Sequence, residues 1–314
     1  MPITRLAIVV PCYNEEEVLP ITIVRMKDLL ADLVGRGIID AASSVSFVDD
    51  GSRDRTWQII EEHALQLPSV RGIKLSKNCG HQNALLAGLL NVEGDAVISV
   101  DADLQDDLGA VERMVMKFAE GAEIVYGVRA RRDTDTAFKR MTAEGYYHLM
   151  KILGVDIVFN HADYRLMGRR AIDALTRYGE VNLFLRGIIP QLGFRTESVF
   201  YDRQELFAGE SKYPLRKMLS LAWNGLTSFS SSPLRWITGL GAVVSICSFL
   251  IGAWALISAL AAGHTIPGWA STVIPVYFLG GIQLLSLGII GEYVAKIYME
   301  SKQRPRYIIE KYAE

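Results

Sequence analysis

The first 130 residues alternate short apolar runs with longer amphipathic stretches. The runs at 6–10, 45–48, 70–75, 96–100 and 123–126 have the length and apolar content of buried strands. The stretches at 15–33, 54–67, 81–90 and 108–118 repeat apolar residues at helical spacing. A regular strand–helix order predicts an α/β fold with a mostly parallel sheet and helices on both of its faces.

A different pattern fills the C-terminal part of the chain. Residues 236–291 form a run of 56 residues without Asp, Glu, Lys or Arg. Turn-forming residues at 262–268 divide this run, which predicts two transmembrane helices at about 236–261 and 272–290. Each has about the 20 residues that a helix needs to cross a bilayer. The alternative, a buried helical hairpin in a soluble core, is disfavoured by the length of the charge-free run.

Basic residues flank the apolar run and are missing from the turn inside it. Arg235 precedes the run, and Lys296, Lys302, Arg304, Arg306 and Lys311 follow it. By the positive-inside rule both ends lie in the cytoplasm, which predicts a multi-pass protein of the inner (cytoplasmic) membrane. The apolar stretch 6–10 is too short for a signal peptide. We therefore expect a cytoplasmic domain at 1–210, a juxtamembrane helix at 211–234, a transmembrane hairpin at 235–298 and a basic cytoplasmic tail at 299–314.

The expected juxtamembrane helix has one apolar face, which predicts that it lies in the membrane interface. The apolar positions recur at helical spacing: Leu215, Met218, Leu219, Ala222, Leu226 and Phe229. Lys212 and Arg216 near its start are candidates for binding a lipid phosphate. The alternative is that such basic residues serve as a general anchor to anionic lipids.

Composition narrows the classes of function. The chain of 314 residues is 50% hydrophobic, has a formal net charge of −2 and contains three cysteines without a CxxC pair. This excludes a wholly soluble protein and a disulfide scaffold, and two spans are too few for a polytopic transporter. The lack of a basic excess also argues against a nucleic-acid partner.

Acidic residues follow three of the predicted strands. The sequences are PCYNEE at 11–16, DDGS at 49–52 and DADLQD at 101–106. Each alone is typical of a turn or a helix cap, but the carboxyl ends of parallel strands meet at one edge of a sheet, where ligands bind. Asp101 and Asp103 are two residues apart in extended chain and so point the same way. Together with phosphate oxygens they suit Mg²⁺ or Mn²⁺.

These motifs resemble those of glycosyltransferase family 2. The resemblance rests on VVPCYNEE, VDDGSRD, KNCGHQNAL and VDADLQD, and it implies the nucleotide-sugar-binding GT-A fold. The later FNHADYRLM and FAGESKYPLRKM, with the helix pair, are similar to enzymes that transfer sugar to polyisoprenyl phosphate. Among these, bacterial bactoprenol (undecaprenyl-phosphate) glucosyltransferases are the most similar, and dolichyl-phosphate mannose synthase is more distant.

The resemblance implies roles for residues along the acidic edge. Pro11, Tyr13 and Glu15 would border the nucleotide, and Asp50 would contact the base or ribose. Asp101 and Asp103 would hold the metal and the ribose end of the diphosphate, with Gln105 beside them. Arg129, after the fifth strand, would meet the diphosphate; its spacing suits a solvated loop arginine equally well.

The resemblance also implies an acceptor side. Asp163 stands where relatives carry the residue usually described as the catalytic base. A phosphate monoester has a second pKa of about 6 and is largely ionised at neutral pH, so Asp163 has the alternative role of orienting the sugar or stabilising charge at its anomeric carbon. Arg203, Ser211, Lys212 and Arg216 would bind the lipid phosphate or the diphosphate.

The sequence departs from the family pattern at two positions. Asp107 stands where relatives commonly have Pro, which changes only a helix start. Leu206 stands where relatives often have Arg, and Arg203 is the candidate substitute for a phosphate contact there.

The implied reaction is inverting transfer of glucose from UDP-glucose to undecaprenyl phosphate, with UDP as the second product. GDP-mannose or a UDP-linked amino sugar are alternative donors. A processive polysaccharide synthase is disfavoured because such enzymes carry Gln-X-X-Arg-Trp, and Ser232 stands where the Gln would be. A non-catalytic, membrane-anchored subunit that binds nucleotide sugars is the rival from another class. The resemblance also implies a homo-oligomer, with a tetramer as the suggested state.

Overall fold

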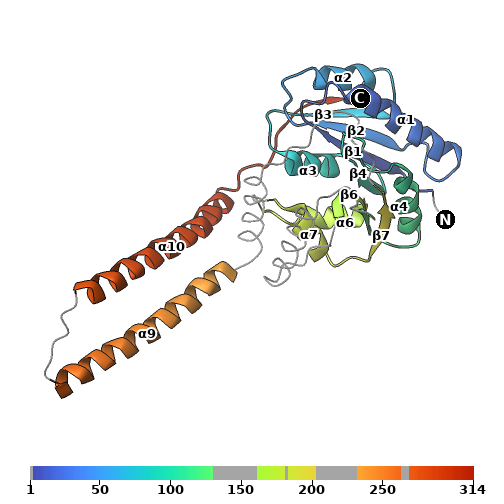
Figure 1. Cartoon of the computed structure of the whole chain (residues 1–314). Helices are drawn as coiled ribbons and strands as arrows, with labels where there is room; N and C mark the ends of the chain where they lie inside the picture. Colours follow the sequence, from blue (N-terminus) through green and yellow to red (C-terminus); the bar gives the residue numbers. More distant parts are fainter. Residues whose placement is uncertain (1–2, 130–160, 181–182, 203–231, 263–268) are drawn as a thin grey trace. The chain divides into compact units, whose positions relative to one another are not determined.

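The chain is divided into two compact units in a computed structural model. The structure describes residues 3–129, 161–180, 183–202, 232–262 and 269–314. Of the described residues, the first unit contains those up to 202 together with 304–314, and the second contains the two longest helices (Figure 1). The expected juxtamembrane helix at 211–234 lies almost wholly outside the described residues.

The first unit is built on one twisted sheet. Within the described residues it has eight strands in the order β7-β5-β6-β4-β1-β2-β3-β8. Parallel pairing joins β4, β1, β2 and β3 in turn and also β5 with β7, whereas β6 and β8 pair antiparallel with their neighbours. The strands are β1 (Leu6–Cys12), β2 (Ser44–Asp49), β3 (Val70–Leu75), β4 (Ala96–Ser99), β5 (Ile124–Arg129), β6 (His161–Gly168), β7 (Thr196–Tyr201) and β8 (Ile309–Ala313). The expectation of a mostly parallel α/β sheet is confirmed.

Within the described residues, the first four helices of this unit overlap the four stretches predicted to be helical, whereas the last two have no counterpart among the predictions. These helices are α1 (Leu19–Gly35), α2 (Thr56–Ala64), α3 (His81–Asn91), α4 (Gly109–Ala119), α6 (Arg169–Leu175) and α7 (Leu185–Gln191). The main difference is that α1 begins at Leu19 rather than at residue 15. Pro20 lies in its first turn, where a fixed φ and a missing N–H favour a helix start. The acidic residues at 15–17 therefore stay in a turn beside the sheet edge.

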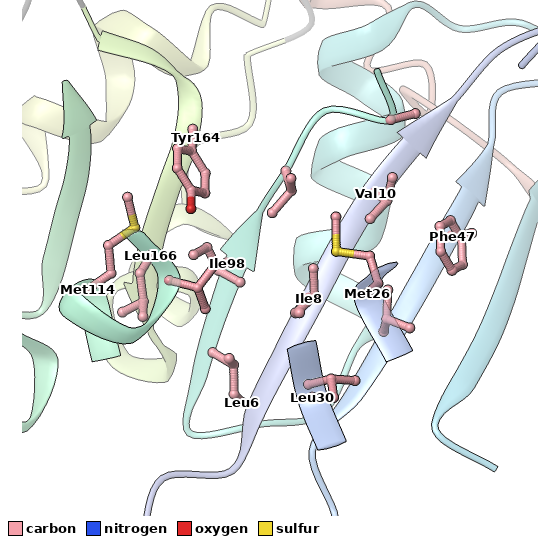
Figure 2. Close-up of a cluster of buried hydrophobic side chains, with 14 of the residues drawn as sticks. Leu6, Ile8, Val10, Met26, Leu30, Phe47, Ile98, Met114, Tyr164 and Leu166 are labelled. Atoms are coloured by element: carbon pink, nitrogen blue, oxygen red, sulfur yellow. The ribbon is translucent and has the colours of Figure 1, made fainter. Parts of the chain in front are cut away.

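Strand β1 lies at the centre of the core, with helices on both of its faces. Ile8 and Val10 are fully buried in a cluster with Met26 and Leu30 of α1 (Figure 2). Val9, which points to the opposite face, contacts α3 so closely that a Cβ built on Gly88 would lie 2.2 Å from Val9 Cγ1. The period of two in the strand thus supplies apolar surface to both layers.

The segment expected to be a tail contributes to the sheet. Residues 299–301 continue the helix before it, and β8 then pairs antiparallel with β3. Lys74 Nζ lies 3.0 Å from Glu310 Oε1, and Lys311 contacts Glu61 of α2. Ala313 is buried against Gly72. Of the basic residues that suggested a tail, Lys311 instead forms an ion pair at the sheet edge.

The second unit contains α9 (Ser232–Ala262) and α10 (Trp269–Ser301). Large apolar side chains on both helices are exposed, among them Phe249, Trp254 and Leu284. One segment among the described residues, Phe278–Ser301, is long and apolar enough to cross a membrane, and α9 contains a shorter apolar stretch, Trp236–Ile251. The first of these overlaps the second predicted span. The two-span hairpin stays a prediction.

Gly88→Ala should destabilise the first unit even though alanine favours helices more than glycine does. The added methyl group would collide with Val9 and lie 3.0 Å from Val48 Cγ2, and overpacking of this kind costs about 1–3 kcal/mol. Gly35→Ala is the matched control, because nothing lies within 4 Å of a Cβ at this helical position. Thermal unfolding in detergent should show a lower Tm for the first variant only. Equal Tm values for the two variants would contradict the close packing of α3 on β1.

Candidate active site

The polar ends of β1, β2 and β4 meet at one edge of the sheet, as the parallel pairing requires. Pro11 and Cys12 pair with Val48 and Asp49, and Asp101 follows shortly after β4. Glu15 is half-buried; burial raises the pKa of this carboxyl, and the nearby charges of Asp103 and Asp101 raise it further. Glu15, Asp101 and Asp103, here called the acidic cluster, are therefore brought together as predicted.

A hydrogen bond from α1 holds the loop that carries Asp101 and Asp103 in place. Thr22 of α1 is fully buried and donates its hydroxyl to the carbonyl of Ala102, 2.8 Å away. Leu104 has a φ of 55°, a conformation that costs energy and is concentrated at functional sites. The turn lets the Gln105 N–H donate to Asp103 Oδ1 at 3.1 Å.

The donor set of this loop fits a hard divalent cation that shares its ligands with a substrate. Gln105 is 2% exposed, and neither polar atom of its amide has a hydrogen-bond partner among the described residues. A buried amide of this kind is costly unless a ligand pairs with it. No set of three or more Asp, Glu, His or Cys side chains in the described part of the chain forms a closed metal site. Two carboxylates with phosphate oxygens completing the shell are typical of Mg²⁺ sites.

Asp101 and Asp163 lie in opposite electrostatic surroundings. Burial raises the pKa of Asp101 to about 6; His81 opposes this rise, while Asp106, Asp163 and Asp103 add to it. Burial also acts to raise the pKa of Asp163, but His81, Arg165 and Arg186 outweigh it and hold that pKa well below its ordinary value. Asp163 is therefore ionised. The ionised form of Asp101 is disfavoured by burial and by the neighbouring carboxylates, and a bound cation would stabilise it.

Both oxygens of Asp163 are engaged. Arg186 donates from Nε to Oδ1 at 3.2 Å and from Nη2 to Oδ2 at 3.1 Å. Arg165, which lies two residues further along β6 and is itself buried, donates Nη2 to Oδ1. His81 Nε2 lies 3.6 Å from Asp163 Oδ2 and 3.8 Å from Asp101 Oδ1. His81 therefore stands between the acidic cluster and the carboxylate predicted to act in catalysis.

Three of these residues were absent from the sequence-based site. Arg165 could have been found, because alternate residues of a strand share a face with Asp163. His81 lies within the KNCGHQNAL motif but has no spacing relation to either carboxylate. Arg186 belongs to α7, and no sequence pattern connects it with β6.

Asp50 is buried and holds a loop in place. Its Oδ1 accepts the Cys79 N–H at 2.7 Å, and its Oδ2 accepts the Gly80 N–H at 2.9 Å. Gly51, at a φ of +67°, packs so closely on this loop that a Cβ would lie 2.6 Å from Asn78 N. Asp50 thus fixes the entry to α3, and its predicted contact with base or ribose stays a prediction.

The other predicted nucleotide residues have varied surroundings. Pro11 is buried within β1, whereas Tyr13 is 41% exposed beyond the strand end. Arg129, at the end of β5, donates Nε to the Tyr201 hydroxyl at 3.4 Å and lies 3.7 Å from Asp106 Oδ1. Arg129 is therefore anchored by neighbours and is not a free loop arginine. Arg203, Leu206, Ser211, Lys212 and Arg216 lie outside the described residues.

Asp50→Asn should destabilise the fold near the site. An asparagine amide can accept from one of the two backbone N–H groups but turns its own NH₂ towards the other, and hydrogen bonds to charged groups contribute about 1.5–3 kcal/mol each. A fall in the free energy of unfolding of about this size is expected by denaturant titration. Asp32→Asn is the control, because Asp32 makes only an exposed ion pair with Arg36. An unchanged unfolding free energy for Asp50→Asn would show that the loop does not depend on the carboxylate.

Comparison with known proteins agrees with this architecture. The family model described as "Glycosyl transferase family 2" matches residues 7–176. The uncharacterized glycosyltransferase YkoT of Bacillus subtilis is 52% identical over 307 residues, covering 97% of this chain and 91% of its own. The bactoprenol glucosyl transferase of Shigella phage SfX is 40% identical over 310 residues, covering 98% and 99%.

Among solved structures, mannosyl-3-phosphoglycerate synthase from Rubrobacter xylanophilus is similar at a TM-score of 0.49. It is 16% identical, and the match covers 76% of this chain and 75% of that one. This likeness bears on neither donor nor acceptor. The family match and the two near full-length relatives, at 52% and 40% identity, are much stronger evidence of kinship. With its GT-A-like sheet, this chain belongs to glycosyl transferase family 2 and is a glycosyltransferase.

Proposed function

We propose that the protein transfers glucose from UDP-glucose to undecaprenyl phosphate or a similar polyprenyl phosphate, with inversion at the anomeric carbon. The observation that carries the proposal is that two kinds of carboxylate lie close together at one sheet edge: the acidic cluster, and Asp163 with its two arginines. The acidic cluster suits a metal-bound diphosphate, and an ionised Asp163 lies one histidine away from it. The near full-length similarity to bactoprenol glucosyl transferase supports the acceptor and the sugar.

Asp101 and Asp103 are the residues that would hold Mg²⁺ or Mn²⁺. When bound, the cation would neutralise charge on the leaving diphosphate, the usual electrostatic strategy for such groups. Gln105, with its unpartnered buried amide, would complete the surroundings of the diphosphate or its ribose. Pro11, Tyr13, Glu15 and Asp50 would border the nucleotide, and Arg129 would meet the diphosphate.

Asp163 would act as a fixed negative charge and not as a proton acceptor. Its depressed pKa and its pairing with two arginines make it a weak base. The acceptor phosphate is already largely ionised and needs no base. Its oxygen would attack the anomeric carbon as the bond to the UDP oxygen breaks, giving the β-linked lipid phosphosugar and UDP. Asp163 would orient the sugar and stabilise positive charge at the anomeric carbon.

The proposed acceptor is a membrane lipid, so the enzyme has to work at a membrane surface, where apolar helices can anchor it. We propose that α9 and α10 anchor the enzyme in the inner membrane as a two-span hairpin with both termini in the cytoplasm. Arg203, Ser211, Lys212 and Arg216 would bind the phosphate of the lipid or of the donor, with Arg203 replacing the arginine that relatives often have at Leu206. A homo-oligomer, such as a tetramer, is part of the same proposal.

A donor panel tests the function directly. Purified protein with Mg²⁺ or Mn²⁺ and undecaprenyl phosphate should move label from UDP-glucose into the organic phase, with no transfer when the lipid is omitted. Label from GDP-mannose or a UDP-amino sugar instead would correct the donor. Label in a growing polymer would favour a processive synthase, and binding of donors without any turnover would favour a non-catalytic subunit.

Asp103→Asn should lower the rate of sugar transfer by at least about 100-fold, because it removes one of the two carboxylates proposed to bind the cation. Mn²⁺ binding, followed by electron paramagnetic resonance in the presence of UDP, should weaken in parallel. Asp107→Asn is the control: Asp107 lies on the same loop, ion-pairs with exposed Arg113, and accepts the Gly109 N–H on Oδ1 at 2.9 Å, a hydrogen bond that an Asn side-chain oxygen can also accept. Undiminished Mn²⁺ binding by Asp103→Asn would remove Asp103 from the metal site.

A further inference from the structure

The start of α3 contacts both sides of the site. Its first residue is His81, and its second residue, Gln82, accepts the Leu185 N–H on Oε1 at 3.0 Å. Leu185 is the first residue of α7, so this hydrogen bond joins the starts of two helices that are 103 residues apart in the chain. The backbone before α3 is fixed in turn by Asp50.

The residue after Leu185 is Arg186, which donates two hydrogen bonds to the Asp163 carboxylate. A guanidinium that bonds both oxygens of a carboxylate fixes its direction as well as its charge. Leu185, Ile188 and Ile189 of α7 are fully buried, while the Arg186 side chain remains about one-third exposed. The position of the guanidinium therefore depends on where α7 begins.

Arg165 cannot fix the orientation of Asp163 alone. It is buried beneath the carboxylate and bonds Oδ1, while its Nε and Nη1 have no hydrogen-bond partner among the described residues. Oδ2 accepts from Arg186 Nη2 at 3.1 Å and also lies 3.6 Å from His81 Nε2. Arg186 of α7 is thus the residue that bonds both oxygens, and it orients the carboxylate together with Arg165 and His81.

We infer that Arg186 and Gln82 are positioning residues for Asp163: Arg186 orients the carboxylate, and Gln82 fixes α7 on α3. The inference rests on the proposed role of Asp163 in sugar transfer. A misplacement of a reacting group by about 1 Å can cost about 100-fold in rate. Loss of either contact should therefore reduce kcat while leaving the binding of the nucleotide, which contacts other residues, nearly unchanged.

Four variants separate position from charge and from stability. Gln82→Met removes the acceptor at nearly the same length, and Gln82→Glu keeps it. Arg186→Lys keeps the positive charge but loses the two-point grip. Arg170→Lys is the control, because Arg170 in α6 forms an ion pair with Glu123 through Nη1 and its side chain is exposed. Each protein is assayed in detergent for transfer to undecaprenyl phosphate and for hydrolysis of UDP-glucose without acceptor.

The expected result is a fall in kcat of about 10- to 100-fold for Gln82→Met and Arg186→Lys, with the KM for the donor within about 3-fold of wild type. Gln82→Glu should recover most of the loss, and Arg170→Lys should match the wild type. Wild-type kcat in Gln82→Met and Arg186→Lys, no rescue by Gln82→Glu, or a change confined to KM would overturn the inference.

The two assays distinguish failure of this inference from failure of the proposed function. If wild-type protein hydrolyses the donor but transfers nothing to the lipid, the acceptor proposal fails, and the same variants test positioning through hydrolysis. If wild-type protein turns over no donor by either route, the role of Asp163 fails and the inference fails with it.

Discussion

Repulsion among carboxylates at the carboxyl edge of the sheet is the constraint on which the site depends. The strand order brings Glu15, Asp101 and Asp103 together, and it places Asp163 of β6 beside them. The protein compensates these charges unequally. Two arginines neutralise Asp163, while the described residues supply no comparable cation to the acidic cluster, whose compensation is left to what binds there. Asp163, which is already paired with arginines, is suited to a fixed charge, whereas the acidic cluster, whose charge the described residues do not balance in this way, is suited to binding a cation.

Much of the fold and part of the site could be predicted from local patterns. The strand–helix alternation and the acidic strand ends follow from periodicity and from parallel topology, so Asp101 and Asp103 could be found without coordinates. Contacts between distant segments could not. Arg186 and His81 reach Asp163 through the packing of α7 and α3, and nothing in the sequence near Asp163 specifies either. The sequence predicts a tail where β8 lies, because the charged residues of this strand suit water as well as an ion-paired sheet edge.

Asp50 illustrates how a motif can carry two requirements at once. The resemblance assigns the residue to the nucleotide, while the structure gives its carboxylate to two backbone amides. The two uses are compatible, since each carboxylate oxygen has a second lone pair. The close approach of Gly51 to the same loop explains why an acidic residue and a glycine stand side by side in this motif. The short sequence thus encodes a loop junction, and the nucleotide contact that the resemblance implies would use the same carboxylate.

The pairing of β8 with β3 has a consequence for the order of events during synthesis. β3 leaves the ribosome more than 230 residues before β8, and α9 and α10 are made in between. Throughout that interval the outer edge of β3 has unpaired backbone groups, a state that invites aggregation. The sheet can be completed only after both long helices have been synthesised. The first unit therefore cannot complete its folding while the second is still being translated.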